Sequence, residues 1–386
     1  MTNRRYQKER AVPNLPHYIV AILLMFLTLS AVQAEDNALS LGKTVANWQL
    51  QQLGYLPGLD TVPEPLVHSR AWEIGAFWVG LTRFADASGD KTYRKALLEQ
   101  GNKNQWKLGP WLEFADDHVI GQSYLWASEN GAGKKALQPM RESFDKILAN
   151  PPEVHLSFYF GEEGYGSAEC LVRWCWCDAL FMSPQAMIGL SLATGNSRYA
   201  DYAFSEFWAT TDFLYDPAEK LYFRDSRFFE KRDDQKRKLF WARGNGWVFA
   251  GIVNILQMLP ADHPERPRMA SLFTEMAARL MVLQKTDGYW APSLLAQEKS
   301  PPESSGSGFF TYGLAYGINA GLLDKKTYLP AVKKGWQALA NAVAADGRLG
   351  WVQQVSDRPD VVREADTHYY GVGAFLLAAS EVSKLQ

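Results

Sequence analysis

Two kinds of helical segment alternate along the chain. Six segments are rich in small and apolar residues on every side, which predicts buried helices; they span about 70–87, 117–129, 184–194, 244–259, 307–321 and 369–383. Six others carry apolar residues on one face and charges on the opposite face, at about 40–54, 91–105, 134–149, 197–214, 265–285 and 328–345. The pattern predicts twelve helices, with one amphipathic helix before each buried one.

Glycines occur in all six buried segments, for example Gly80 and Gly373. An isolated glycine weakens a helix by about 1 kcal/mol relative to alanine, so this many glycines require a packing reason. Close contact between neighbouring helices around a narrow ring supplies that reason. We therefore expect the buried helices to form the inner ring of a closed structure.

The connections between the helices are of two lengths. Short turns follow the buried helices, and Ala87–Tyr93 resembles Ala193–Tyr199 in having a glycine for the helix end, then an Asx residue and a tyrosine; Leu323–Tyr328 is a looser copy. Long connections precede the buried helices, which begin at intervals of about 50 to 65 residues, as in a helical-hairpin repeat. Six such hairpins predict an all-α fold, an (α/α)6 barrel, with its functional mouth at the N-termini of the inner helices.

The first 34 residues have the pattern of an export signal. Four basic residues precede the apolar stretch Tyr18–Leu29, which is too short to span a bilayer comfortably, and Val32–Ala34 is a small-residue cleavage site. We expect cleavage after Ala34 and export to a periplasm or to the medium. Residues 35–386 contain no Pro/Ser-rich linker that would divide them, so we expect a single barrel domain there.

Net charge excludes several classes of partner. Residues 1–34 hold four Lys or Arg and one Glu, so their removal changes the net charge from −2 to −5. A protein with this balance has no general affinity for nucleic acid or for anionic membranes, and local cations must attract any anionic substrate. We expect neither partner, and we expect a monomer or a weak homodimer.

The three cysteines, Cys170, Cys175 and Cys177, lie in one short segment. A Cys-x-Cys pair is a weak indication of a metal site, and the histidines are too scattered to complete one. We expect no metal and no cofactor. Two states of the cysteines stay open, namely buried thiols or one local disulfide in an oxidising compartment.

Asp178 is a lone acid among aromatic residues just before a buried helix. It follows Trp176, while Ser183 and Pro184 suit the N-cap and first position of the helix that Gly195 ends. Because Ser183 already offers a cap, Asp178 is left in a Trp-lined loop. A carboxyl group in such surroundings is desolvated enough to act as an acid near neutral pH.

Arg243 lies in a similar position, between Trp241 and Trp247 at the start of the next buried helix. An arginine there can clamp an anion. An acid and an anion clamp among indole rings favour a site for an acidic sugar.

Further polar residues lie just before the other inner helices. The candidate site residues are Asp178, Arg243, Asp116, Asp117, His118, Ser304, Ser307, Trp176, Trp241 and Trp247. Each has a structural alternative. The aspartates suit helix caps, the tryptophans suit a core, Arg243 suits a buried ion pair, and the serines suit a capped loop with Glu303. The histidines, including His155 and His368, suit hydrogen-bonded structural positions.

Four stretches resemble glycoside hydrolase family 105, the unsaturated rhamnogalacturonyl hydrolases, which are related to the unsaturated glucuronyl hydrolases of family 88. They are Trp176–Met182, Trp241–Trp247, Glu303–Ser307 and Tyr370–Phe375. The resemblance runs from about residue 65 to the C-terminus and implies the same (α/α)6 barrel. It also implies a substrate with a 4,5-unsaturated uronic acid at the non-reducing end, left there by a polysaccharide lyase.

The resemblance implies a hydration reaction that needs one acid/base carboxyl rather than the usual pair. Asp178 would protonate C4, water would add at C5, and the ring would open to release the aglycone. Asp117 matches a second catalytic carboxylate, although its neighbour Asp116 leaves that choice open. Arg243 and Trp247 match sugar-binding positions.

The sequence departs from this family at Arg224, where many members carry a histidine after an aromatic pair. An extra arginine beside the site favours a more anionic substrate. Two other classes stay open: a non-catalytic barrel that binds oligosaccharides, and a sugar epimerase or lyase on the same barrel. The parent polysaccharide, whether pectin or an algal uronan, is not determined by the sequence.

Overall fold

The computed structural model describes residues 38–53, 68–159, 168–298 and 300–385. The predicted signal segment lies outside these ranges, so export stays a prediction. The buried helices predicted from the sequence are α2 (Trp72–Ser88), α4 (Gly121–Ala127), α7 (Pro184–Thr194), α9 (Ala242–Met258), α11 (Ser304–Asn319) and α13 (Tyr369–Val382). The amphipathic ones are a helix over residues 38–51, α3 (Lys91–Lys103), α5 (Gln138–Ala149), α8 (Arg198–Leu214), α10 (Arg266–Val282) and α12 (Lys325–Asn341).

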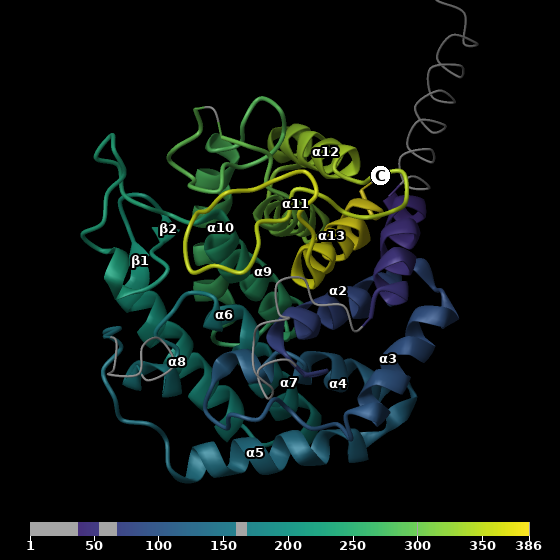
Figure 1. The fold of residues 1–386 in the computed structure, drawn as a ribbon. Helices are drawn as coiled ribbons and strands as arrows, with labels where there is room; N and C mark the ends of the chain where they lie inside the picture. The colour runs from purple at the N-terminus through teal and green to yellow at the C-terminus, as the bar shows by residue number, and fades with distance from the viewer. Residues whose placement is uncertain (1–37, 54–67, 160–167, 299, 386) are drawn as a thin grey trace, which may run out of the picture.

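The inner helices close into a ring (Figure 1). Helix α2 contacts α4, α4 contacts α7, and the series continues through α9 and α11 to α13, which packs against α2 again. The outer helices α3, α8, α10 and α12 lie against α2, α7, α9 and α11. The predicted (α/α)6 barrel is confirmed. None of the described helices is long and apolar enough to cross a membrane.

The glycines of the inner ring have the predicted packing role. A Cβ atom on Gly80 would lie 2.4 Å from the carbonyl oxygen of Gly373, and one on Gly373 would lie 2.5 Å from that of Ala76. Real Cβ atoms do not approach so closely, so α2 and α13 touch through their backbones. This contact closes the barrel.

The short turns also follow the prediction. Gly89 and Gly195 end α2 and α7 in the left-handed region, with φ of 63° and 73°. Asp90 then caps α3 by accepting from the Thr92 N–H, and Asp324 caps α12 through Thr327. Local capping chemistry therefore fixes this end of the barrel.

At the opposite end of the barrel, the observed elements differ from those predicted from the sequence in three places. The inner helix α4 begins only at Gly121, because Ala115–His118 forms a separate 3-10 turn. A one-turn helix, α6 (Ala179–Met182), precedes α7. A two-stranded antiparallel hairpin, β1 (Tyr215–Asp216) and β2 (Leu221–Tyr222), extends the connection before α9.

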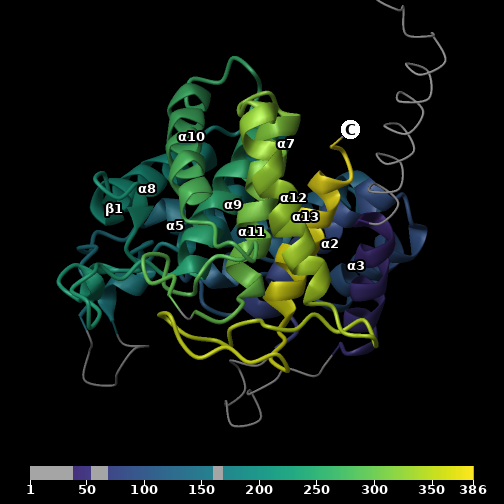
Figure 2. The same cartoon turned by 90° about the horizontal axis from the view of Figure 1, so that it is seen from above.

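The long connections gather at one end of the barrel. Figure 2 shows those before α11 and α13 along the lower edge of the molecule. They contact each other where the Ser304 N–H donates to the carbonyl of Trp351. The N-termini of the inner helices open onto these loops, and this end is the barrel mouth.

Candidate active site

Asp178 lies at the barrel mouth, directly before α6. Its backbone is helical, with φ −60° and ψ −32°, and its side chain caps no helix. Ser183 and Pro184 occupy the predicted positions at the start of α7, but the predicted cap bond of Ser183 is wrong. The Ser183 hydroxyl lies 2.7 Å from His118 Nδ1 instead. Asp178 is 8% exposed as a whole residue, and its carboxyl faces the mouth rather than a helix end.

Arg224 is the nearest cation to Asp178. Its Nε lies 3.6 Å from Asp178 Oδ2, and its Nη1 donates to Asp225 Oδ2 at 2.9 Å. The Arg224 carbonyl accepts from the Cys177 N–H at 2.8 Å, which ties the two segments together. The residue at which the sequence departs from family 105 therefore contacts the candidate acid directly.

Two opposing effects set the acidity of Asp178. Burial raises the pKa of its carboxyl, and the charge of Arg224 opposes this rise, with smaller lowering effects from Cys177 and Arg243. The net direction is upward. Asp178 therefore keeps its proton to a higher pH than an exposed aspartic acid, as a general acid requires.

Asp116, rather than Asp117, shares the electrostatic surroundings of Asp178. Burial raises the pKa of Asp116 well above its usual range, with the charge of Asp178 as the next cause. Its Oδ1 atom is buried and has no hydrogen-bond partner among the described residues. Asp117 instead accepts from the Trp111 N–H at 2.6 Å, and burial raises the pKa of Asp117 to about 6. We therefore take Asp116 as a candidate for the second carboxyl beside the predicted Asp117, and the choice between the two stays a prediction.

Arg243 lies in the first turn of α9 and is 1% exposed. Its Nη1 and Nη2 donate to the carbonyls of Gln353 and Gln354 at 2.6 and 2.9 Å. The guanidinium carbon lies 4.4 Å from the Trp241 ring centre and 4.6 Å from that of Tyr370. Its Nε has no hydrogen-bond partner within the described ranges. No carboxylate neutralises it in an ion pair there, so its charge acts on the mouth.

Residues at the starts of α13 and α2 that were not among the predicted candidates also lie near Arg243. The His368 ring stacks on Tyr370 at 4.3 Å, and Trp72 stacks on the same tyrosine at 5.2 Å. Both His368 ring nitrogens are without a hydrogen-bond partner among the described residues, contrary to the expected structural hydrogen bond. Burial lowers the pKa of His368 to about 3, with Arg243 as the second cause, so its ring is neutral.

The three candidate tryptophans are packed below the mouth. Trp176 stacks on Phe114 at 5.3 Å, Trp247 lies 4.4 Å from Phe309, and Trp241 donates to Gln353 Oε1. All three are 2% exposed or less. Trp111, which is 45% exposed, is far more accessible than these three tryptophans. Its position in a Pro-Trp loop gave no sequence signal.

His118, Ser304 and Ser307 make contacts that belong to the fold. His118 lies between Ser183 and the Leu112 carbonyl, and burial lowers its pKa to about 4. Ser304 Oγ donates to the Gly350 carbonyl, and Ser307 Oγ accepts from the Trp290 N–H. Glu303 caps α11 by accepting from the N–H groups of Ser305 and Gly306. These contacts hold the loop at the mouth in place.

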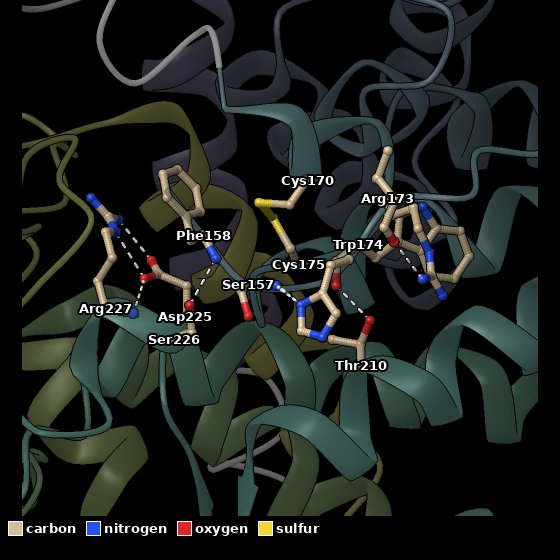
Figure 3. The surroundings of a disulfide bond; sticks show 12 residues. Ser157, Phe158, Cys170, Arg173, Trp174, Cys175, Thr210, Asp225, Ser226 and Arg227 are labelled. Carbon is tan, nitrogen blue, oxygen red and sulfur yellow. Dashed lines mark hydrogen bonds and ion pairs between the residues drawn. A yellow bond between two sulfur atoms is a disulfide. The ribbon is translucent and has the colours of Figure 1, made fainter. Parts of the chain in front are cut away.

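A disulfide braces the segment that carries Asp178. Cys170 and Cys175 form a disulfide (Figure 3). Cys177 is a buried free thiol, so of the two states left open for the cysteines the local disulfide is the one present. Between them, Arg173 makes two bonds of 2.8 Å to Glu206 of α8. The Trp174 carbonyl accepts from Thr210 of the same helix. The segment leading to Asp178 is thereby fixed to α8.

Within the described ranges, no group of three His, Cys, Asp or Glu side chains is placed to hold a metal ion. The site consists of a buried acid, a second carboxyl and two arginines among aromatic rings at a barrel mouth. This combination of fold and site defines a glycoside hydrolase that acts on acidic sugars.

Comparison with known proteins identifies the family. Residues 43–386 match the family model "Glycosyl Hydrolase Family 88", and the chain belongs to that family. It is 42% identical, over 90% of its own length and 86% of the relative's, to an unsaturated 3S-rhamnoglycuronyl hydrolase from Alteromonas sp. (strain LOR). The resemblance stated from the sequence is confirmed. So is the predicted class of activity, removal of unsaturated uronic acid from lyase products.

Solved structures agree in fold. A family 88 glycosyl hydrolase from Bacteroides vulgatus has a TM-score of 0.78 and 28% identity, covering 91% of this chain and 99% of that one. A polysaccharide lyase has a TM-score of 0.77 and 26% identity, covering 91% and 97%. The same barrel therefore occurs in proteins named for two different reactions.

Proposed function

We propose that the protein removes a 4,5-unsaturated uronic acid from an oligosaccharide in which the next sugar is a sulfated rhamnose. The observation that carries the proposal is the Asp178 carboxyl, buried at the mouth with its pKa raised and with Arg224 and Arg243 beside it. An acid so placed can protonate a carbon atom, and the arginines suit the sugar carboxylate.

In the proposed reaction, Asp178 gives its proton to C4, and the electrons of the C4=C5 double bond form the new C–H bond. The ring oxygen stabilises the positive charge at C5. Water adds to C5 and passes its proton to the Asp178 carboxylate, which restores the acid. The hemiketal then opens by breaking the bond from C5 to the ring oxygen, and the hemiacetal left at C1 releases the aglycone alcohol. In this proposal Asp116 orients the water.

The position of oxygen incorporation tests this sequence of steps. In heavy-oxygen water, a single turnover trapped by borohydride should place the label at C5 of the released uronate, with none at C1. The saturated uronide with the same linkage should not react, because it has no double bond to protonate. Label at C1 would mean direct attack at the anomeric carbon, which requires a second carboxylate working with Asp178.

The sulfated aglycone is supported by two observations. The Alteromonas relative is named an unsaturated 3S-rhamnoglycuronyl hydrolase, and we interpret 3S as a sulfate at O3 of the rhamnose. Beside the mouth, Arg227 joins Arg224 on Asp225 and reaches Asp357 of the loop before α13, which places two guanidinium groups together. Arginine is the side chain best suited to binding an oxyanion through two hydrogen bonds.

Matched disaccharides with and without the O3 sulfate should differ in kcat/KM by at least about tenfold in favour of the sulfated one, the effect of one charge-assisted hydrogen bond. Loss of absorbance of the unsaturated uronate gives the rate. Equal rates on the two disaccharides would remove sulfate from the proposed specificity while leaving the hydration reaction in place.

A lyase reaction in addition to the hydrolase reaction is the alternative to exclude, because a polysaccharide lyase shares the fold at 26% identity. The two reactions change absorbance in opposite directions. A lyase creates the unsaturated uronate and raises the absorbance, whereas the proposed hydrolase consumes it. An absorbance rise on an intact polysaccharide would favour the lyase.

We also propose that the protein works outside the cytoplasm. The signal pattern of residues 1–34 suggests export, and the Cys170–Cys175 disulfide is consistent with an oxidising compartment. Both the lyase products and the hydrolase would then meet in the same compartment.

A further inference from the structure

A cavity lies inside the barrel, lined by residues other than those of the Asp178 site. Its volume is about 370 Å³, and its lining residues come from α2, α4, α7 and α9, reaching the last turns of α7 and α9 at Ala193 and Met258. At its other end the cavity reaches Gln122 and Gln185, in the first turns of α4 and α7, so it runs along the inside of the barrel beneath the Asp178 site. A cavity of this size falls within the range of roughly 300–1,000 Å³ that is typical of small-molecule sites.

The inner wall of this cavity is built on α6. Gln122 Nε2 donates to the Phe181 carbonyl at 2.7 Å, and Gln185 Nε2 donates to that of Leu180 at 2.8 Å. Helix α6 begins directly after Asp178. The two amides therefore separate the cavity from the catalytic acid by a single helical turn.

Gln185 leaves a buried acceptor in this wall. Its Nε2 also donates to the Gly251 carbonyl at 3.0 Å, and since both of its partners are carbonyls, the orientation of the amide is settled. The Oε1 atom then has no hydrogen-bond partner among the described residues, and the side chain is 1% exposed. A buried acceptor without a partner costs roughly 1–3 kcal/mol, so a hydroxyl group of a ligand would be stabilised there.

Arg83 is the cation of the cavity. It makes no hydrogen bond or ion pair within the described part of the chain. The buried carboxylate Glu381, which shares the surroundings of Tyr312 with Arg83, is already engaged by Gln257, Asn319 and Lys384. The one acid in the lining, Glu129, is exposed. The charge of Arg83 is therefore available to an anion.

We propose that this cavity is a second ligand site, which binds a small acidic sugar. The sugar carboxylate contacts Arg83, where a guanidinium can offer two parallel N–H donors. One of its hydroxyl groups donates to Gln185 Oε1, and the indole ring of Trp126 gives an apolar face beside the amides of Asn254 and Gln257. An acid without hydroxyl groups would leave Gln185 unsatisfied, and a neutral sugar would leave Arg83 without its anion.

Calorimetric titration of the intact protein with D-glucuronate tests the site without any turnover. The Arg243→Lys variant binds acidic sugars weakly at the mouth. The glucuronate binding that this variant retains therefore reports the cavity. We expect this binding to persist in Arg243→Lys and to weaken at least tenfold when Arg83→Gln is added. D-glucose and acetate should each bind at least tenfold more weakly than glucuronate.

Arg141→Gln is the matched control, because Arg141 is an exposed arginine on α5 that lies beside Asp145 and Tyr199, outside the lining of the cavity. It should leave the affinity unchanged. The thermal midpoint of Arg83→Gln should also equal that of the parent, because no ion pair is lost. Glucuronate binding that is unaffected by Arg83→Gln, or glucose binding of equal strength, would overturn the proposal. Since the readout is binding at a separate site, its failure would say nothing against the reaction at the mouth.

Discussion

Asp178→Asn is expected to lower kcat by about 10²–10⁴-fold, the usual effect of losing one acid/base group. The amide keeps the shape of the carboxyl and can still face Arg224 and Cys177, but it has no proton to give to C4. The KM for the unsaturated disaccharide should change little, and the fold should be retained. Loss of absorbance of the unsaturated disaccharide measures kcat and KM, and a thermal melt measures whether the fold is retained.

Asp145→Asn is the matched control, because Asp145 is half exposed on α5 and accepts a hydrogen bond from Tyr199 far from the mouth. It should leave kcat unchanged. Asp116→Asn should lower kcat less than Asp178→Asn if Asp116 only orients water. Activity of Asp178→Asn within a few-fold of the parent would remove this residue from the mechanism.

The pH profile gives an independent check on Asp178. The acid acts in its protonated form, so kcat/KM should fall as pH rises through its pKa. The charge of Arg224 lowers that pKa, and its removal in Arg224→Gln should move the alkaline limb to higher pH. Arg232→Gln, a change at an exposed arginine that bonds only backbone carbonyls in the described structure, should not move it.

The barrel could be predicted because its signals are local. Glycines such as Gly80 and Gly373 and the caps at Gly89 and Gly195 each act within one turn or one helix contact. Helix α6 was missed because Asp178 to Ser183 contains no capping pattern that separates one turn from the helix after it. The carbonyls of Leu180 and Phe181, near its C-terminal end, accept instead from the side-chain amides of Gln185 and Gln122.

The site was only partly predictable. Asp178 and Arg243 stand out as lone charges among tryptophans, and the structure places both at the mouth. The choice between Asp116 and Asp117 depends on how the 3-10 turn directs neighbouring side chains, which spacing does not reveal. Ser304 and Ser307 face backbone groups from distant loops, at Gly350 and Trp290, and a sequence shows no such partners.

Arg243→Lys is expected to lower kcat/KM by about 10- to 100-fold and to raise KM, because a hydrogen bond to a charged group contributes about 1.5–3 kcal/mol. The Arg243 guanidinium bonds two carbonyls and stacks between Trp241 and Tyr370 at the same time. A lysine ammonium is a point charge without that planar fork. It cannot keep both carbonyls and also present parallel N–H groups to a sugar carboxylate.

Arg243 also holds the loop at Gln353 and Gln354, so Arg243→Lys has a structural effect as well. A control must separate this structural effect from the loss of substrate binding. Arg266 also donates to two carbonyls, those of Leu256 and Leu259, but at the turn between α9 and α10. Arg266→Lys should lower the thermal midpoint without raising KM, whereas Arg243→Lys should do both. A KM for the unsaturated disaccharide that stays at the parent value in Arg243→Lys would assign this arginine to the architecture of the mouth, and the sugar carboxylate would then have to be held by Arg224.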